Sequence, residues 1–166
     1  MNDKIIYGEN IENMNEKFMK EALKEAKKAY EADEIPIGAV IVKNDKIIAR
    51  AHNQKEIKND ATRHAEIIAI EKASKKLQGW RLDDCEMYVT LEPCMMCAGA
   101  IVQARLKKVY IGAMDEKMGY CGSVINLLQY NKYDYHVESE SGILSDECSK
   151  IVKDFFAELR NKKSKG

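Results

Sequence analysis

Short apolar segments alternate with amphipathic ones along most of this chain, and this alternation restricts the fold more than any other sequence feature. Continuous apolar runs of a few residues are typical of buried strands, whereas apolar residues spaced three and four apart are typical of helices. Strands that alternate with helices indicate a layered α/β domain with a largely parallel centre. A short turn at residues 43–46 also predicts an antiparallel hairpin at one edge. We expect helices at residues 18–30, 64–77, 93–106 and 145–159, a short helix at 124–130, and strands at 35–42, 47–49, 87–91, 109–113 and 135–139.

The length and charge of the chain limit the class of protein. Its 166 residues suit a single domain, in which we expect residues 1–13 to be a flexible N-terminal extension and residues 160–166 a basic tail. With 27 basic and 27 acidic residues the formal net charge is zero. This balance excludes a generally basic nucleic-acid coat but allows a local basic patch. No apolar run approaches the ~18 residues of a membrane span, and the N-terminus lacks the pattern of a secretory signal, so we expect a soluble, cytoplasmic protein.

Cysteine usage points to metal or redox chemistry rather than to disulfides. The chain has five cysteines, an odd number, and a cytoplasmic location argues against a disulfide framework. Cys94 and Cys97 form a C-x-x-C pair. In such a chain this pair indicates a metal site or a redox pair. Cys85 and Cys148 fit ordinary core thiols.

Two short segments, each at the start of a predicted helix, carry candidate metal ligands. The first is His64-Ala65-Glu66 and the second contains Pro93, Cys94 and Cys97. One imidazole nitrogen and two thiolates are ligands that suit Zn²⁺. Three protein ligands leave a fourth position for water, which is typical of catalytic zinc, and bound water loses its proton near pH ~7. Glu66 is close enough in sequence to accept that proton without binding the metal.

Less specific interpretations of these segments exist. A lone C-x-x-C is also typical of redox pairs, and H-x-E alone occurs by chance. The conjunction is more specific, because both segments follow strands, both begin helices, and the intervening residues suffice for one βα unit. A structural zinc site would need a fourth ligand, for which Cys121 is the candidate.

The two segments, H-A-E and P-C-M-M-C, resemble the cytidine deaminase superfamily. Further segments are similar to the bacterial tRNA adenosine deaminases, and the resemblance covers roughly residues 19–162. These segments are Ile35–Val40, His52-Asn53, Tyr88–Cys94, Cys97–Ala100, Gly112–Asp115, Gly122-Ser123, Gly142–Leu144 and Asp154–Phe156.

The resemblance implies a fold, an activity and a metal site. The implied fold is a three-layer α/β/α deaminase domain with a mixed five-stranded sheet. The implied activity is hydrolytic deamination of adenosine to inosine at position 34, the wobble position, of a tRNA anticodon, by a homodimer with one zinc ion per subunit. Carried over by position, His64, Cys94 and Cys97 would hold the zinc and Glu66 would move the proton.

The resemblance also implies contacts to RNA. Asn53 matches an asparagine that hydrogen-bonds the flipped base, and Asp115 and Lys117 match a loop along the path of the anticodon strand. Phe156 matches an aromatic residue of the last helix near the RNA. For Lys117 a solvated loop charge is an equal alternative. Simple core packing is the alternative for Phe156.

The chain departs from the family pattern at two positions, and two other functions stay open. Ala61 stands where many members have proline, and Arg63 stands where they have a small residue, so Arg63 could point to solvent or contact a phosphate. One alternative function is deamination of a free base or nucleoside of the guanine or cytidine type. The other, from a different class, is a non-catalytic RNA-binding module stabilised by zinc.

Overall fold

The computed structural model describes the backbone of residues 3–166 and the side chains of residues 14–166. Helices and strands alternate along the chain, as the hydrophobic pattern predicts. The elements are α1 (Asp3–Glu31), β1 (Gly38–Lys43), β2 (Lys46–His52), α2 (Lys55–Lys58), α3 (Ala65–Leu77), β3 (Cys85–Leu91), α4 (Met95–Ala104), β4 (Lys108–Ala113), the 3-10 turn η1 (Leu127–Gln129), β5 (Glu138–Ser141) and α5 (Ser145–Ser164).

The strands form one mixed sheet in the order β2-β1-β3-β4-β5. β1 pairs antiparallel with both β2 and β3, whereas β3–β4 and β4–β5 pair in parallel. The hairpin therefore supplies the β2 edge. The predicted α/β class and the mixed five-stranded sheet are confirmed.

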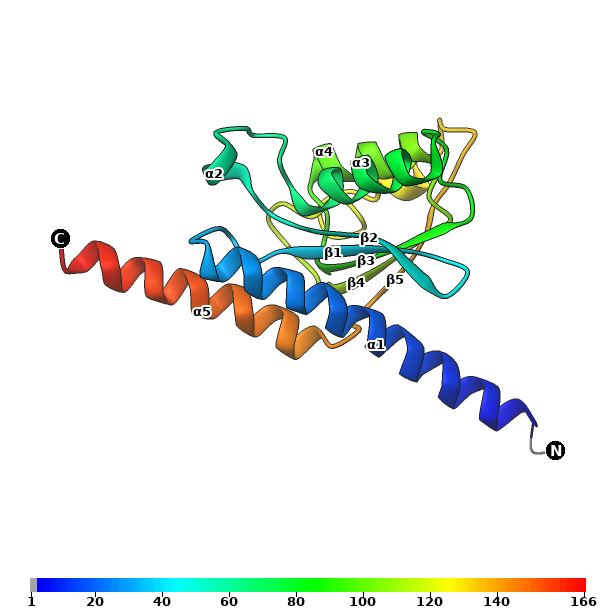
Figure 1. The fold of residues 1–166 in the computed structure, drawn as a ribbon, viewed down its shortest axis with the longest axis horizontal. Helices are drawn as coiled ribbons and strands as arrows, with labels where there is room; N and C mark the ends of the chain where they lie inside the picture. Colours follow the sequence, from blue (N-terminus) through cyan, green and yellow to red (C-terminus); the bar gives the residue numbers. More distant parts are fainter. Residues whose placement is uncertain (1–2) are drawn as a thin grey trace.

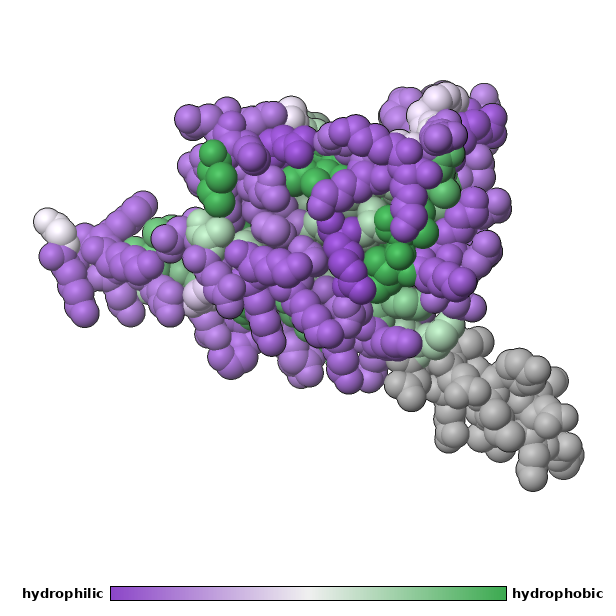
Figure 2. All heavy atoms as spheres, viewed as in Figure 1, coloured by the Kyte–Doolittle hydropathy of each residue, from purple (hydrophilic) through white to green (hydrophobic). Residues whose placement is uncertain are grey.

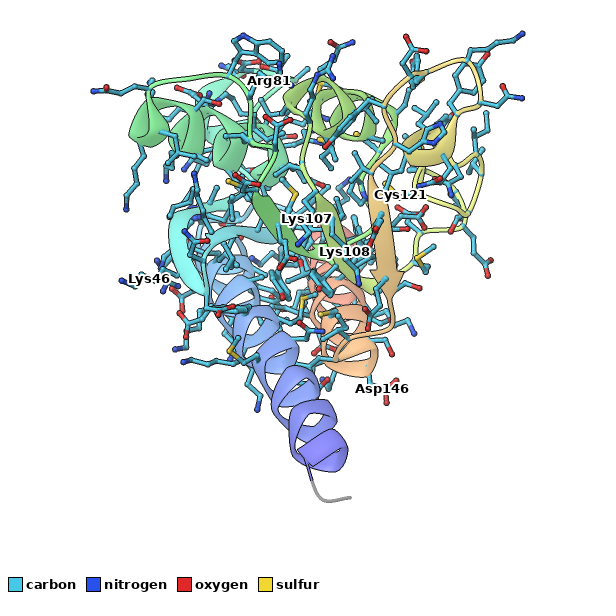
Figure 3. All side chains as sticks on the ribbon, turned by 90° about the vertical axis from the view of Figure 1, so that its right-hand side faces the viewer. Lys46, Arg81, Lys107, Lys108, Cys121 and Asp146 are labelled. Carbon is cyan, nitrogen blue, oxygen red and sulfur yellow. The ribbon has the colours of Figure 1, made fainter. Side chains whose placement is uncertain are left out.

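Helices cover both faces of the sheet. α1 and α5 lie against one face, and α3 and α4 lie against the other (Figure 1). The side view separates the same three layers (Figure 3). β1 shows how the sequence builds them: Ala39 and Ile41 join the core under α3 and α4, and Val40 and Val42 join the core under α1. A strand buried on both faces must be apolar at successive positions, which explains its unbroken apolar run.

Several element boundaries differ from the sequence prediction. β1 starts at Gly38 rather than at residue 35, β5 spans 138–141 rather than 135–139, and the helix predicted at 124–130 is one 3-10 turn. The short helix α2 was not predicted. All four residues of β5 are exposed Glu or Ser, so this edge strand carries no apolar alternation that could have fixed its limits.

The two predicted terminal segments have different outcomes. The backbone of residues 3–13 forms the first turns of α1, while residues 1–2 lie outside the described residues. The flexibility of residues 1–13 stays a prediction. The basic C-terminal segment is largely helical, because α5 continues to Ser164. Lys162 forms an ion pair with Asp33 at 3.3 Å.

The surface facing the viewer in Figure 2 is largely hydrophilic, with small and separate apolar patches. This distribution agrees with a chain in which one third of the residues are charged. Within the described part of the chain, no helix combines the length and the apolar character needed to cross a bilayer.

Gly38 is the point at which α1 packs most closely on the sheet. A Cβ placed there would lie 2.0 Å from the carbonyl oxygen of Ala22 and 2.5 Å from the backbone nitrogen of Ala26. Backbone atoms of a packed helix cannot move aside as a flexible side chain can.

We therefore expect Gly38→Ala to lower the free energy of unfolding by about 2 kcal/mol or more, measured by urea denaturation. The matched control is Gly79→Ala, because a Cβ at Gly79 meets no atom within 4 Å. Equal midpoints for the two variants would contradict this interpretation of the packing.

Candidate active site

The two predicted ligand segments occupy equivalent places in the fold. His64 is the N-cap residue of α3, with φ −78° and ψ 152°, and Cys94 is the N-cap residue of α4, with φ −72° and ψ 177°. Neither side chain hydrogen-bonds to the terminus of its own helix within the described residues. Both are therefore available to other partners. Cys97 follows one turn into α4 and is buried.

These three residues converge. Nδ1 of His64 lies 3.6 Å from Sγ of Cys94 and 3.5 Å from Sγ of Cys97. All three ligand atoms lie within 4.8 Å of one another. A tetrahedral zinc ion with ordinary Zn–N and Zn–S bonds would hold such nitrogen and sulfur atoms about 3.6 Å apart. The donor set and its spacing thus fit zinc.

Cys121 does not join this group. Among the described residues, the group that could hold a metal comprises His64, Cys94 and Cys97. Cys121 is buried, and its backbone N–H donates to the Glu92 carboxylate at 3.1 Å. Figure 3 labels Cys121 on the loop that follows β4. The group that could hold a metal therefore has three members, and its catalytic use stays a prediction.

The two thiols differ in acidity. Hydrogen bonding with Cys97 lowers the pKa of Cys94 to about 4, and the nearby His64 acts in the same direction. The hydrogen bond to Cys94, together with burial, raises the pKa of Cys97. Cys94 is therefore the more acidic of the two adjacent thiols. A divalent cation would stabilise both thiolates, which is the chemistry expected of a metal site.

Glu66 lies beside the ligands on the first turn of α3. Its side chain is 3% exposed, and Oε2 accepts a hydrogen bond from the thiol of Cys97 at 3.5 Å. Burial raises the pKa of Glu66. A buried carboxyl with a raised pKa can hold a proton and release it, as a general acid–base group must.

His64, Glu66 and Cys94 face a cavity of about 740 Å³. Asp115 and Lys117, from the loop after β4, line the same cavity, as does Phe156 of α5. The structure thus brings three of the four predicted RNA contacts to the metal-ligand group. Their role in binding RNA stays a prediction.

Asn53, the fourth predicted contact, lies behind this cavity. It follows β2 and is 4% exposed. Its Nδ2 donates to Oε2 of Glu34 and to the carbonyl of Ile35, both at 3.4 Å, and its backbone N–H donates to the carbonyl of Ile37 at 3.1 Å. Ile35 and Ile37 line the cavity, whereas Asn53 is not among the lining residues. Its side-chain contacts are at the long limit of hydrogen bonding, so the amide remains free to take a better partner.

Two buried carboxylates at this site were missed by the sequence analysis. Glu34 is fully buried and accepts the backbone N–H of Ile57 at 2.7 Å, which ties α2 to the segment before β1. Glu92 is 3% exposed and accepts hydrogen bonds from the loop after β4. The available signal was an acidic residue at the end of an apolar segment, since Glu34 directly precedes Ile35 and Glu92 directly follows Leu91. A carboxylate is buried there only when it is hydrogen-bonded.

Arg63, the residue that departs from the family pattern, pairs with α3. Its guanidinium lies 2.8 Å from Oε2 of Glu71. Hydrogen bonds from Lys75 and Arg63 lower the pKa of Glu71 to about 2. The Arg63 side chain is 26% exposed, so solvent reaches it, and its contact with a phosphate stays a prediction. Ala61 is exposed.

Comparison with protein families and curated relatives gives one consistent result. The family model described as MafB19-like deaminase matches residues 13–160. The tRNA-specific adenosine deaminase of Bacillus subtilis is 52% identical over 149 residues, covering 90% of this chain and 92% of its own. The enzyme of the same name from Aquifex aeolicus is 46% identical over 146 residues, covering 88% and 96%.

Solved structures extend the likeness to three dimensions. A structure from a study of A-to-I editing by tRNA:A34 deaminases at the wobble position of transfer RNA is 42% identical, with a TM-score of 0.78, and covers 81% of this chain and 97% of that chain. A guanine deaminase from Nitrosomonas europaea is 22% identical, with a TM-score of 0.75, and covers 86% of this chain and 84% of that chain. At that identity the guanine deaminase shares the fold alone. The chain belongs to the MafB19-like deaminase family, among the tRNA-specific adenosine deaminases.

Proposed function

We propose that this protein is a zinc-dependent enzyme that converts adenosine to inosine at position 34 of a tRNA anticodon. The observation that carries the proposal is one cavity in which a His/Cys/Cys ligand group lies next to the buried, non-ligating Glu66. The family membership and the likeness to wobble-position deaminases support adenosine in tRNA as the substrate.

His64, Cys94 and Cys97 would hold the zinc. When bound, zinc acts as a Lewis acid and makes hydroxide available at neutral pH. The proton chemistry falls to Glu66, whose carboxylate takes a proton from the attacking water and passes it to N1 of adenine. Glu66 then takes the second proton from the new hydroxyl group on C6 and gives it to the departing amino group, which leaves as ammonia. Water and adenosine are consumed, and inosine and ammonia are formed.

The remaining residues would bind and orient the substrate. The Asn53 amide can donate to a ring nitrogen of adenine, which helps to hold C6 toward the reacting water. Lys117 offers a cation to a phosphate, Phe156 offers a ring face on which a base can stack, and Asp115 lines the same cavity. The anticodon loop presents its bases already unstacked, which lowers the cost of extruding one by a few kcal/mol.

We also infer a homodimer acting in the cytoplasm, where its tRNA substrate is found. A groove of about 420 Å³ between α3 and α4 is lined by Ile70, Ala100 and Trp80, and Trp80 is 61% exposed. An exposed aromatic side chain beside an apolar groove is typical of a protein interface. Light scattering during size-exclusion chromatography measures the mass, and a value near 18.9 kDa would contradict the dimer.

One assay separates this function from its alternatives. The purified zinc-loaded protein is incubated with an A34 anticodon stem-loop, the same stem-loop with guanosine at position 34, free adenosine, cytidine and guanine. We expect ammonia and inosine from the A34 stem-loop alone. Release of ammonia from a free base or nucleoside would favour the small-molecule deaminase, and zinc-dependent RNA binding without product would favour the non-catalytic module.

A further inference from the structure

We propose that Glu92 is a positioning residue: its carboxylate holds the loop after β4, residues 114–123, as one wall of the substrate cavity. The identity of the substrate that meets this wall rests on the function proposed above. Glu92 lies at the end of β3, between Leu91 and the Pro93 that precedes the metal-ligand helix. It lines the cavity, as do residues 114–118 of the loop.

The carboxylate accepts hydrogen bonds from both ends of the loop. Oε1 accepts the backbone N–H of Asp115 at 3.1 Å, and Oε2 accepts the backbone N–H groups of Cys121 and Ser123, each at 3.1 Å. The Ser123 hydroxyl also donates to Oε1. A buried carboxylate without such partners would be strongly unfavourable, so the carboxylate and the loop hold each other in place.

Gly119 gives an independent sign of the same contact. A Cβ at this position would lie 2.2 Å from both Cδ and Oε2 of Glu92. The loop therefore approaches the carboxyl group so closely that only glycine fits without displacing it.

The fixed loop ends determine where the cavity wall stands. Oδ1 of Asp115 accepts the backbone N–H groups of Lys117 and Met118 at 3.0 and 3.1 Å, and the carbonyl of Asp115 accepts the N–H of Gly119 at 2.8 Å. Fixing Asp115 thus fixes Lys117 and Met118, both of which line the cavity. Through this series of contacts, Glu92 acts on substrate binding without touching the reacting atoms.

The test compares two substitutions that disturb the tether from opposite sides. Glu92→Gln keeps the size of the side chain but places an NH₂ group against backbone N–H donors. Gly119→Ala keeps the carboxylate but forces it and the loop apart. Gly79→Ala is the matched control, because its Cβ meets no atom within 4 Å. Each protein is examined for amide hydrogen exchange, zinc content, and kcat and KM on the A34 stem-loop.

We expect exchange at the amides of Asp115, Cys121 and Ser123 to become at least about tenfold faster in both variants. We expect KM for the stem-loop to rise by about tenfold while kcat stays within about threefold, because the loop binds the substrate and does no proton transfer. Zinc content should equal that of the control.

Three results would overturn the role of Glu92. Unchanged exchange in the loop would show that the carboxylate does not tether it. Loss of zinc in Glu92→Gln would show that Glu92 supports the metal-ligand helix instead. A fall in kcat without a rise in KM would place its effect on the chemical step. If the unmodified protein forms no inosine on the A34 stem-loop, the proposed function fails, but hydrogen exchange still decides whether Glu92 holds the loop.

Discussion

Glu66→Gln is expected to lower turnover on the A34 stem-loop by at least about a thousandfold while the protein keeps its zinc. Glutamine has the size of glutamate but cannot take a proton from water or return one to the leaving group. Glu66 is buried and accepts its hydrogen bond from Cys97, and burial raises its pKa, so a neutral amide fits this environment without a large cost in folding. The loss should therefore appear in kcat, measured by inosine release.

The control for this experiment is Glu71→Gln on the same helix. The Glu71 side chain is 39% exposed, and its partners Arg63 and Lys75 are not among the residues that line the cavity. Exposed ion pairs contribute at most about 1 kcal/mol, so this variant should retain its turnover and its zinc. If Glu66→Gln retained comparable turnover, Glu66 would not be the proton carrier. If instead it lost its zinc, Glu66 would have to be counted with the ligands.

The convergence of His64, Cys94 and Cys97 could be predicted because its signals are local. Pro93 and the apolar run after it mark the start of α4, and the polar residues before His64 mark the start of α3. Placing two helix starts at one end of the sheet requires only that each helix follows its own strand. The distances that the structure gives agree with that expectation, although the role of each residue remains to be tested.

The contacts of Glu34, Glu92 and Arg63 could not be predicted in the same way. Glu92 bonds to residues 23 to 31 positions later, and Glu34 bonds to Ile57, so both depend on how loops return to the sheet. Hydrophobic periodicity carries no information about which distant loop will contact a given carboxylate. Arg63 could reach several partners, and its pairing with Glu71, eight residues later on α3, is seen only in the structure.

The predicted boundaries of two elements, β5 and the start of α1, differ from those in the structure. β5 consists of exposed Glu and Ser, so no apolar alternation marks its limits. α1 begins at Asp3, and Tyr7, Ile11 and Met14 continue the helical spacing of Phe18 toward that start, a signal that the prediction of a helix from residue 18 did not use. Both wrong boundaries belong to peripheral parts of the fold, and neither changes the position of the metal-ligand group.

Cys94→Ala is expected to abolish stoichiometric zinc binding and, with it, the stability that zinc supplies. A ligand that binds only the folded state stabilises it by about 3–4 kcal/mol when present at 100 to 1,000 times its Kd. Thermal unfolding followed with and without added zinc measures this difference. Unmodified protein should lose the gain on treatment with a chelator, and Cys94→Ala should show no gain at any zinc concentration. The metal-free forms of the two proteins should unfold at similar temperatures, because Cys94 lies at the surface of the core, in an N-cap position.

Cys121→Ala supplies the matched control, since Cys121 is a buried thiol near the site but outside the ligand group. Its removal should leave a small cavity, whose cost is the same with and without zinc. One zinc ion per chain should remain. The two alanine variants therefore separate the loss of a ligand from the loss of a buried sulfur atom.

A Cys94→Ala protein that still bound one zinc ion and gained stability from it would remove Cys94 from the ligand group. Cys121 would then be the first residue to test as the third ligand. The open coordination position on which the proposed chemistry depends would then belong to a different set of ligands.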